Sequence, residues 1–373
     1  MITIREAISK KELKQFILFS FDLYKDNPNW IPPLIQDELV TFDKTQNPVF
    51  ENAEAYFYCA YKDGKMVGKV AAIVNWSEVK DLGKKKVRFG WFDVIDDIEV
   101  TKALLEKVYE LGRKHKLEEV EGPMGFSNLD KVGLLSEGFE HIGTMITWYN
   151  YPYYLTHLEQ LGYVKEKQFL ESVFPFANVK PEVFERASEF INKRYQLRTV
   201  NCKSTKEVLL YADQMFDLFN ECYAKLSSFV AISDAQKEFF KKKYMGMINP
   251  EFINFVFDAN DKMIAFSIVM PSLTEALKKA NGRLFPFGWY HLLRAKTKTN
   301  AILFYLIGIH PDYQNKGVTA PIFMEYYKAF KKFNIETCIR TPELDENNAI
   351  HNLWKTFDPV IHKRRCTYMK KLE

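Results

Sequence analysis

The sequence predicts an α/β fold made of two tandem domains that share one plan. Three observations support this prediction. The chain has 373 residues, and at roughly 150 residues per domain this length suits two domains or slightly more. Short alternating or continuous apolar runs, typical of strands, are interspersed with segments of helical periodicity. The order of these segments in the first half recurs in the second half.

The local signals of the first half define nine elements. Residues 10–24 have helical periodicity, the proline-bearing stretch 27–36 is expected to be loop or extended chain, and Asp63-Gly64 supplies the positive φ of a tight hairpin turn. The expected strands are 2–5, 55–61, 66–75, 87–95, 119–123 and 163–171, and the expected helices are 10–24, 100–115 and 153–161.

A link at residues 174–181 separates the halves, and the second half repeats the order with two helical insertions. The expected strands are 197–201, 252–258, 263–271, 301–310, 337–341 and 360–370, and the expected helices are 204–226, 235–245, 289–296, 318–333 and 347–357. The segment KMVG at 65–68 is matched by KMIA at 262–265, which is 262 − 65 = 197 positions later. We therefore predict two domains, residues 1–173 and 174–373.

Composition and charge exclude several classes of protein. Hydrophobic residues make up 47% and charged residues 27% of the chain, as in ordinary globular proteins. The net charge of 52 − 48 = +4 falls short of what binding to duplex DNA through many phosphates requires, and a small anionic ligand fits better. The five cysteines are scattered and the histidines lack metal-ligand spacing, so we expect neither disulfides nor a metal.

The N-terminal segment is charged from its fifth residue, and no apolar stretch approaches the 18 residues of a membrane span. We therefore expect a cytoplasmic protein with no membrane span.

The most informative segment, residues 304–323, reads FYLIGIHPDYQNKGVTAPIF. A buried strand runs into a turn whose glycine opens an amphipathic helix, so backbone N–H groups and the positive end of the helix dipole converge. Gly317 allows close approach of a phosphate, Lys316 adds charge, and Gln314 and Asn315 add donors. This pattern predicts an anion site.

These residues resemble the signature of the GNAT superfamily of acyl-CoA N-acyltransferases, His-Pro-x-Tyr-Gln-x-x-Gly-x-Gly/Ala, with Thr319 in place of the last Gly or Ala. A second match is Asn347 at the start of a helix, followed by Trp354 where many relatives have a tyrosine that protonates the thiolate. The indole N–H cannot serve as that acid. The resemblance implies two GNAT-like domains, each a mixed, mostly antiparallel sheet flanked by helices.

The resemblance also implies acetyl-CoA or another acyl-CoA as co-substrate and an amine as acceptor. The coenzyme-binding residues that it implies are Ile307, Gly308, Ile309, Gln314, Asn315, Lys316, Gly317, Val318, Thr319, Asn347 and Trp354. For the proton transfers the candidates are Glu343, Asp345 and Tyr305, and Glu121 or Glu137 from the first domain are further candidates for the base.

The first half has a different loop between its corresponding strand and helix. Residues 91–100 read WFDVIDDIEV, with no glycine and four carboxylates, which would repel phosphates. We therefore expect that this copy has lost coenzyme A binding. A second unusual stretch holds five of the 16 glycines between Gly122 and Gly143. Such a loop either walls the acceptor pocket or is purely structural.

The function expected from the sequence is acyl-CoA-dependent transfer of an acetyl or other acyl group to an amine. Two other interpretations fit the tandem arrangement. The first is a Fem-like transferase that uses aminoacyl-tRNA, with the basic segments 241–243 and 363–365 on the RNA. The second is a non-catalytic module that binds acyl-CoA.

Overall fold

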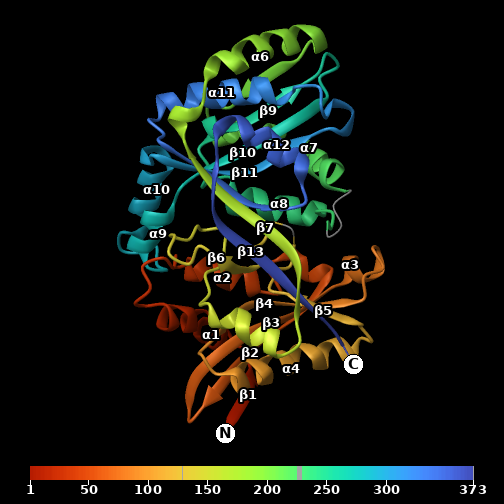
Figure 1. The fold of residues 1–373 in the computed structure, drawn as a ribbon, viewed down its shortest axis with the longest axis vertical. Coiled ribbons are helices and arrows are strands. Elements are labelled where there is room, and N and C mark those ends of the chain that lie inside the picture. The colour runs from red at the N-terminus through yellow and green to blue at the C-terminus, as the bar shows by residue number, and fades with distance from the viewer. Residues whose placement is uncertain (128, 225–228, 373) are drawn as a thin grey trace.

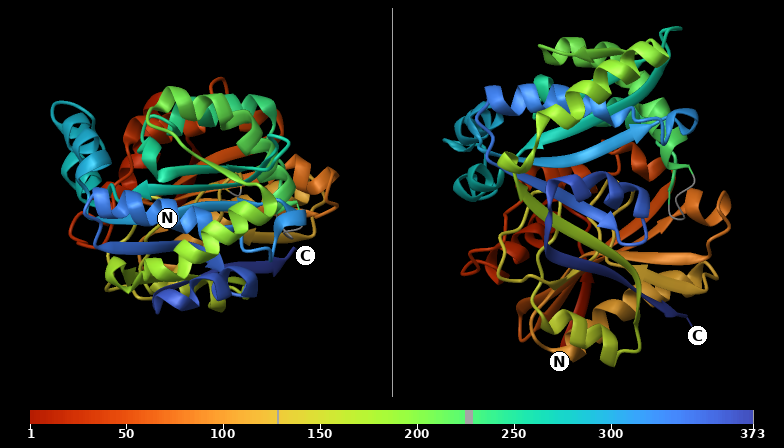
Figure 2. Two further views of the ribbon diagram at one scale, coloured as in Figure 1. Left: turned by 90° about the horizontal axis from the view of Figure 1, so that it is seen from above. Right: turned by 45° about the horizontal axis from the view of Figure 1, so that its top comes forward.

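Helices cover both faces of one continuous sheet in the computed structural model (Figures 1 and 2). The structure describes residues 1–127, 129–224 and 229–372. The strands of the first half are β1 (Ile2–Glu6), β2 (Ala53–Lys62), β3 (Lys65–Asn75), β4 (Lys86–Val94), β5 (Glu119–Gly122), β6 (Leu134–Glu137) and β7 (Val164–Pro175). Its α-helices are α1 (Lys10–Leu23), α2 (Ile35–Phe42), α3 (Trp76–Lys80), α4 (Ile98–Lys114) and α5 (Tyr153–Gln160).

The second half repeats this order with additional helices. Its strands are β8 (Arg198–Asn201), β9 (Ile253–Phe257), β10 (Met263–Pro271), β11 (Ala301–Ile309), β12 (Thr337–Leu344) and β13 (Val360–Lys371). Its α-helices are α6 (Pro181–Tyr195), α7 (Thr205–Tyr223), α8 (Asp234–Tyr244), α9 (Thr274–Ala280), α10 (Gly288–Lys298), α11 (Thr319–Lys332) and α12 (Asn348–Trp354). The predicted end of the helix 204–226 lies outside the described residues.

Local chemistry explains where several elements begin and turn. Ser9 caps α1 in a capping box with Glu12. Asp63 and Gly64 have φ values of 52° and 78° in the β2–β3 hairpin, which confirms the predicted tight turn. Helices α2, α3, α6 and α9 and strand β6 were not predicted from the sequence. Helix α2 begins at Ile35, within the last two residues of the stretch expected to be loop or extended chain.

The sheet order is β1-β2-β3-β4-β5-β13-β7-β12-β11-β10-β9-β8, with β6 paired to β13. Among the described strand pairs, only β4–β5 and β11–β12 are parallel, which confirms the mixed, mostly antiparallel fold. The last strand of each half pairs with the fifth strand of the other half: β13 lies against β5, and β7 lies against β12. We call β7 and β13 the crossed strands; they pair with each other and join the halves (Figure 1).

Apolar clusters fill both sides of the sheet in each half. In the first half one cluster packs under α4 and α5 and another under α1 and α2. In the second half one cluster packs under α7 and α8 and another under α6, α11 and α12. In the described part of the chain, no helix has the length and apolar character needed to cross a bilayer.

Candidate functional site

Strand β11 changes its pairing halfway along. It pairs in parallel with β12 only over residues 301–304, but it pairs with β10 as far as Ile309. A β-bulge falls at Tyr305, opposite the step between Ile268 and Val269. Residues 305–309, which include the predicted Ile307, Gly308 and Ile309, thus have no β-ladder partner on the β12 side among the described residues.

The turn after β11 leaves backbone donors unpaired at the start of α11. Asn315 and Gly317 have φ values of 60° and 77°, a region that glycine adopts readily and asparagine tolerates. Val318 is the N-cap and makes no side-chain capping bond. Within the described residues, the N–H groups of Gly317, Val318 and Thr319 have no hydrogen-bond partner. This geometry suits an anion.

Two side chains hold the turn in place. Gln314 donates from Nε2 to the carbonyl of Ile309 at 3.3 Å, which ties the turn to the end of β11. The ammonium of Lys316 lies over the rings of Tyr313 and Tyr195, 5.1 Å and 5.6 Å from their centroids. Helix α6 therefore contributes to the turn through Tyr195, and Lys316 adds positive charge beside the unpaired N–H groups.

The candidate base Glu343 belongs to a buried polar cluster. It lies within β12, not beyond it as expected, because the strand continues to Leu344. The indole N–H of Trp354 donates to Glu343 Oε1 at 3.0 Å, and Arg340 forms an ion pair with Oε2. Burial raises the pKa of Glu343, although Arg340 opposes the shift. The structure thus brings two predicted residues, Glu343 and Trp354, into direct contact.

The remaining predicted residues on α12 and β12 have different surroundings. Asn347 caps α12 by accepting the Ile350 N–H at 3.3 Å, so its local role is to start the helix. Asp345 is exposed just after β12. Tyr305 donates its hydroxyl to the carbonyl of Leu129 at 3.2 Å, and burial raises its pKa. Asp345 and Tyr305 are not brought together with Glu343 by any hydrogen bond or ion pair of the described residues.

The carboxylates proposed to reach in from the first half are bound to other groups. Glu121 is buried and forms an ion pair with Lys86 at 2.5 Å. Glu137, at the end of β6, pairs with Arg364 at 3.1 Å. Both contacts lie within the central part of the sheet, around β5, β6 and β13.

The helix in the first half that corresponds to α11 has a filled N-terminus. Asp97 caps α4 by accepting the Glu99 N–H at 3.1 Å, and Lys62 pairs with the same carboxylate at 2.7 Å. The hydrogen bond from Lys62 lowers the pKa of Asp97, so it is ionised at neutral pH. An anion approaching this helix would meet a negative charge in place of free N–H groups.

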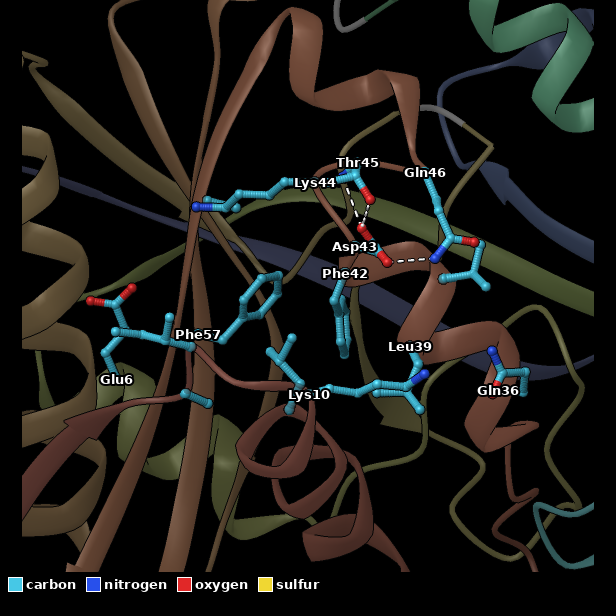
Figure 3. Close-up of a pocket in the computed structure, with 15 residues that line it drawn as sticks. Glu6, Lys10, Gln36, Leu39, Phe42, Asp43, Lys44, Thr45, Gln46 and Phe57 are labelled. Carbon is cyan, nitrogen blue, oxygen red and sulfur yellow. Dashed lines mark hydrogen bonds between the residues drawn. The ribbon is translucent and has the colours of Figure 1, made fainter.

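Two cavities open in the first half, and neither is lined by β11 or the turn before α11. The larger, of about 320 Å³, lies between β1, α1, α2 and β2. Figure 3 shows Phe42 and Phe57 on its apolar floor and Lys10, Lys44 and Asp43 around it. Asp43 accepts hydrogen bonds from Thr45 and Gln46 within the loop after α2.

The smaller cavity, of about 40 Å³, has room for about three water-sized groups. It is lined by Lys69, Asp93, Glu38, Trp91 and Lys131, together with Gly143 and other residues of the glycine-rich loop. The same loop supplies the Leu129 carbonyl that accepts from Tyr305. The loop therefore reaches both the first-half cavity and the bulge of β11, while its expected role as a wall of the acceptor pocket stays a prediction.

Two residues near β11 were not predicted. Tyr223, at the end of α7, donates to the carbonyl of Ile307 at 3.0 Å. Alignment of α7 with α1 would have suggested it, because Tyr24 follows α1 in the first half. Arg340 falls within the expected strand 337–341, and a charged residue inside a strand next to the core was a sign of an ion pair. In the described part of the chain, no group of His, Cys, Asp or Glu side chains is arranged to hold a metal.

Comparison with solved structures places the chain in a known fold. The tandem GNAT protein from the clavulanic acid biosynthesis pathway superposes with a TM-score of 0.59 at 10% identity, covering 100% of this chain and 99% of that one. The GCN5-related N-acetyltransferase from Sphaerobacter thermophilus gives a TM-score of 0.53 at 10% identity, covering 100% and 96%. The chain thus has the GNAT fold in its tandem form, a fold found in N-acetyltransferases.

Two curated proteins are similar in sequence over most of their length. Protein YghO of Escherichia coli (strain K12) is 25% identical over 376 aligned residues, covering 99% of this chain and 95% of that protein. The bacterial ceramide synthase of Caulobacter vibrioides (strain NA1000 / CB15N) is 24% identical over 319 residues, covering 84% and 82%. No family model matches the chain.

Proposed function

We propose that the chain is an acyl-CoA-dependent N-acyltransferase with one coenzyme site, at the turn between β11 and α11. The observation that carries the proposal is the uncapped start of α11, where the N–H groups of Gly317, Val318 and Thr319 are unpaired beside Lys316. These donors fit the phosphates of coenzyme A. The GNAT fold supports the same assignment.

The reaction requires an uncharged amine, donors for the oxyanion and an exit for the thiolate. The amine nitrogen attacks the thioester carbonyl carbon, a C–N bond forms, the C–S bond breaks, and coenzyme A leaves as a thiolate. The backbone N–H groups of Ile307 and Ile309 point to the edge of β11 that lacks a ladder partner, and they would receive the carbonyl oxygen. Because a thiol has a pKa of about 8.5, the thiolate can leave near neutral pH without a strong acid. Trp354 therefore need not donate a proton.

We assign the general base to Glu343. It is partly buried near the point where β11 and β12 separate, and the desolvation raises its pKa, which makes its carboxylate a better proton acceptor. The amine proton would pass to Glu343 and then to solvent or to the departing thiolate. Arg340 and Trp354 orient the carboxylate through their contacts with its two oxygens.

We further propose a long-chain amine as acceptor and a long-chain acyl group as donor. The support is the similarity to a protein named bacterial ceramide synthase, because a ceramide is a fatty-acid amide of a long-chain amino alcohol. The apolar side chains beside the bulge of β11 would be the contacts of an acyl chain: Tyr305 and Leu306 are partly buried against a cluster that contains Phe219, Phe229 and Phe266.

We propose that the first half does not bind coenzyme A and instead shapes the acceptor side. The carboxylate of Asp97 occupies the N-terminus of α4, so a phosphate would have to displace it. The acidic run 93–99 adds repulsion. One coenzyme per chain is the expected stoichiometry.

Calorimetric titration of acetyl-CoA and longer acyl-CoAs tests the coenzyme site. Gly317→Glu places bulk and charge among the unpaired N–H groups and should weaken binding by roughly a hundredfold. The matched control is Gly64→Glu, because Gly64 has a positive φ of 78°, close to the 77° of Gly317, but lies in the β2–β3 hairpin. The two substitutions share the backbone strain of a positive φ, and at Gly317 the added Cβ would also lie 3.2 Å from Ile191 Cδ1. Binding by Gly64→Glu should equal that of the wild type.

Each other outcome points to a different function. No binding of any acyl-CoA by the wild-type protein would overturn the proposal, and aminoacyl-tRNA would become the donor to test. Binding at one site per chain, with no thiol release when long-chain amines are added, would favour the non-catalytic module over the transferase.

A further inference from the structure

Helix α10 and the loop before it expose an unusual amount of apolar surface. The exposed fractions are 77% for Phe285, 68% for Phe287, 44% for Trp289 and 60% for Leu293, and Tyr290 is also exposed. Trp289 and Leu293 are four residues apart, so they lie on one face of the helix. We call Phe285, Phe287, Trp289, Tyr290 and Leu293 the aromatic face. Exposed apolar residues elsewhere, such as Leu210 and Phe190, lie on other helices.

The opposite side of this segment packs against the rest of the molecule. Leu292 and Ala295 are partly buried against a cluster that contains Leu273, the N-cap of α9, Leu277 of α9 and Ile31 of the first half. The Gly282 carbonyl accepts the N–H of Ile35 at 3.0 Å. The segment is therefore fixed across the junction of the two halves while its aromatic face points outward. In Figures 1 and 2, α9 and α10 lie at one edge of the molecule.

The segment is also strongly basic. From residue 274 to residue 298 it has six basic residues and one acidic residue, Glu275, which gives 6 − 1 = +5, whereas the whole chain has a net charge of +4. The basic residues are Lys278, Lys279, Arg283, Arg294, Lys296 and Lys298. Arg283, Arg294 and Lys298 are exposed beside the aromatic face. The positive charge of the chain is thus concentrated where the apolar side chains are exposed.

We propose that residues 274–298 bind the surface of an anionic lipid bilayer. Exposed Phe, Trp, Tyr and Leu side chains would enter the boundary between headgroups and acyl chains, and the basic residues would attract anionic headgroups. Charge complementarity favours this partner. A neutral apolar surface would leave the basic residues without counter-charges, and a protein groove would have to supply both an apolar patch and matching acidic groups. The proposal does not depend on the acyltransferase function, although a membrane surface is where a long-chain acceptor would be found.

Flotation with lipid vesicles tests this surface. The full chain is mixed with vesicles of phosphatidylcholine alone or of phosphatidylcholine with phosphatidylglycerol, and the bound fraction is measured at low and high salt. We expect binding to the anionic vesicles that weakens with salt. Phe285→Ser with Trp289→Ser should lower the partition coefficient by about tenfold or more. Arg294→Glu should lower it by at least about fivefold.

A matched variant keeps the test specific. Leu210→Ser with Phe190→Ser also removes two exposed apolar side chains and should leave vesicle binding unchanged. Equal thermal unfolding of all variants shows that they are folded. The proposal is overturned if the wild-type protein does not float with anionic vesicles, or if the control variant loses as much binding as the aromatic-face variant. A dimer in solution that Phe285→Ser with Trp289→Ser abolishes, without vesicle binding, would show instead that a second copy covers this face.

Discussion

The two halves place different side chains at equivalent points of one scaffold. In the first half Lys69 lies directly opposite Asp93 across β3 and β4, and in the second half Phe266 lies directly opposite Gly308 across β10 and β11. The two pairs occupy corresponding positions, because an equivalent backbone hydrogen bond lies two residues beyond each of them. In the first half the Ile95 N–H donates to the Val67 carbonyl, and in the second half the His310 N–H donates to the Ile264 carbonyl. One half is polar where the other is apolar.

The residues around each pair differ in the same way: they are polar in the first half and mainly apolar in the second. Ser20 of α1 accepts from Lys69 at 2.6 Å and donates to Asp93 at 2.7 Å, and Tyr24 donates to Asp93 at 2.7 Å. The hydroxyl of Tyr154 accepts the Val94 N–H at 2.9 Å. In the second half the ring of Phe219 lies 6.5 Å from that of Phe266. In the first half polar side chains of α1 and α5 therefore bind β4 and its neighbour. In the second half an apolar ring stands at the corresponding place beside β11, and Tyr223 supplies a polar contact, to the Ile307 carbonyl.

The proposed function assigns catalysis to the second half, so the largest expected effect on turnover comes from Glu343. Glu343→Gln removes the proton acceptor and should lower kcat by about 10²–10⁴-fold. Asp345→Asn, two residues away and exposed, is the matched control and should retain wild-type kcat. The measurement is thiol release from acyl-CoA with a long-chain amine. Equal activity of the two variants would remove Glu343 from the mechanism.

The contacts that unite the halves should dominate stability. Glu171 is fully buried between Lys363, at 3.0 Å, and Arg365 on the crossed strands. Glu171→Gln leaves both cations without a buried counter-charge and should lower the free energy of unfolding by about 3–5 kcal/mol. Glu137→Gln, which breaks the exposed pair with Arg364, should cost at most about 1 kcal/mol. Denaturant unfolding of both variants measures the difference.

The pH dependence of this effect has a definite sign. Burial alone would raise the pKa of Glu171, but Arg365 and Lys363 outweigh it and lower the pKa from 4.5 to about 2. Because the folded-state pKa is the lower one, the stabilisation is present above pH 4.5 and is lost as the pH falls toward 2. The stability gap between wild type and Glu171→Gln should therefore narrow over that range. A gap that widened on acidification would contradict this account.

Breaking the pair of Lys69 and Asp93 in the first half should lower the free energy of unfolding and leave coenzyme binding unchanged. Lys69→Met leaves Asp93 buried without its cation, and we expect a loss of about 3 kcal/mol in the free energy of unfolding. At the equivalent position in the second half, Phe266→Leu should cost less than about 1.5 kcal/mol. Acyl-CoA affinity, measured by calorimetry, should not change in Lys69→Met. A loss of acyl-CoA affinity in Lys69→Met would indicate that the coenzyme binds in the first half, contrary to the proposal.

The smallest expected effect concerns Asp97, whose carboxylate occupies the N-terminus of α4. Asp97→Ala removes the cap of α4 and its pair with Lys62 and should cost about 1 kcal/mol of stability. Calorimetry should still show one acyl-CoA per chain, because the turn before α4 has no glycine to admit a phosphate. A second bound coenzyme in this variant would show that Asp97 alone had closed the first-half site.

The sequence predicted those features that depend on neighbouring residues. The hairpin at Asp63-Gly64 and the turn at Gly317 follow from local conformational preferences, and both are present. Helix α2 has only eight residues, too few for a clear periodicity. The exchange of β7 and β13 depends on strands that are distant in the sequence. Arg340 and Glu343 are only three residues apart, but their contact depends on an irregularity of β12 between them, where its register against β7 shifts. An alternating strand pattern specifies which face is buried, but not which strand is adjacent.

The position of β13 has a consequence for synthesis of the chain. Its residues 360–371 leave the ribosome after every other described strand, yet they pair with β5 near the middle of the sheet. Domains commonly fold in order as they emerge, N-terminal first. Here the first half cannot complete its sheet until β13 has been synthesised, so the edge of β5 that β13 will occupy stays unpaired while residues 123–359 are made. A nascent chain arrested before β13 is therefore expected to be the state that chaperones must protect.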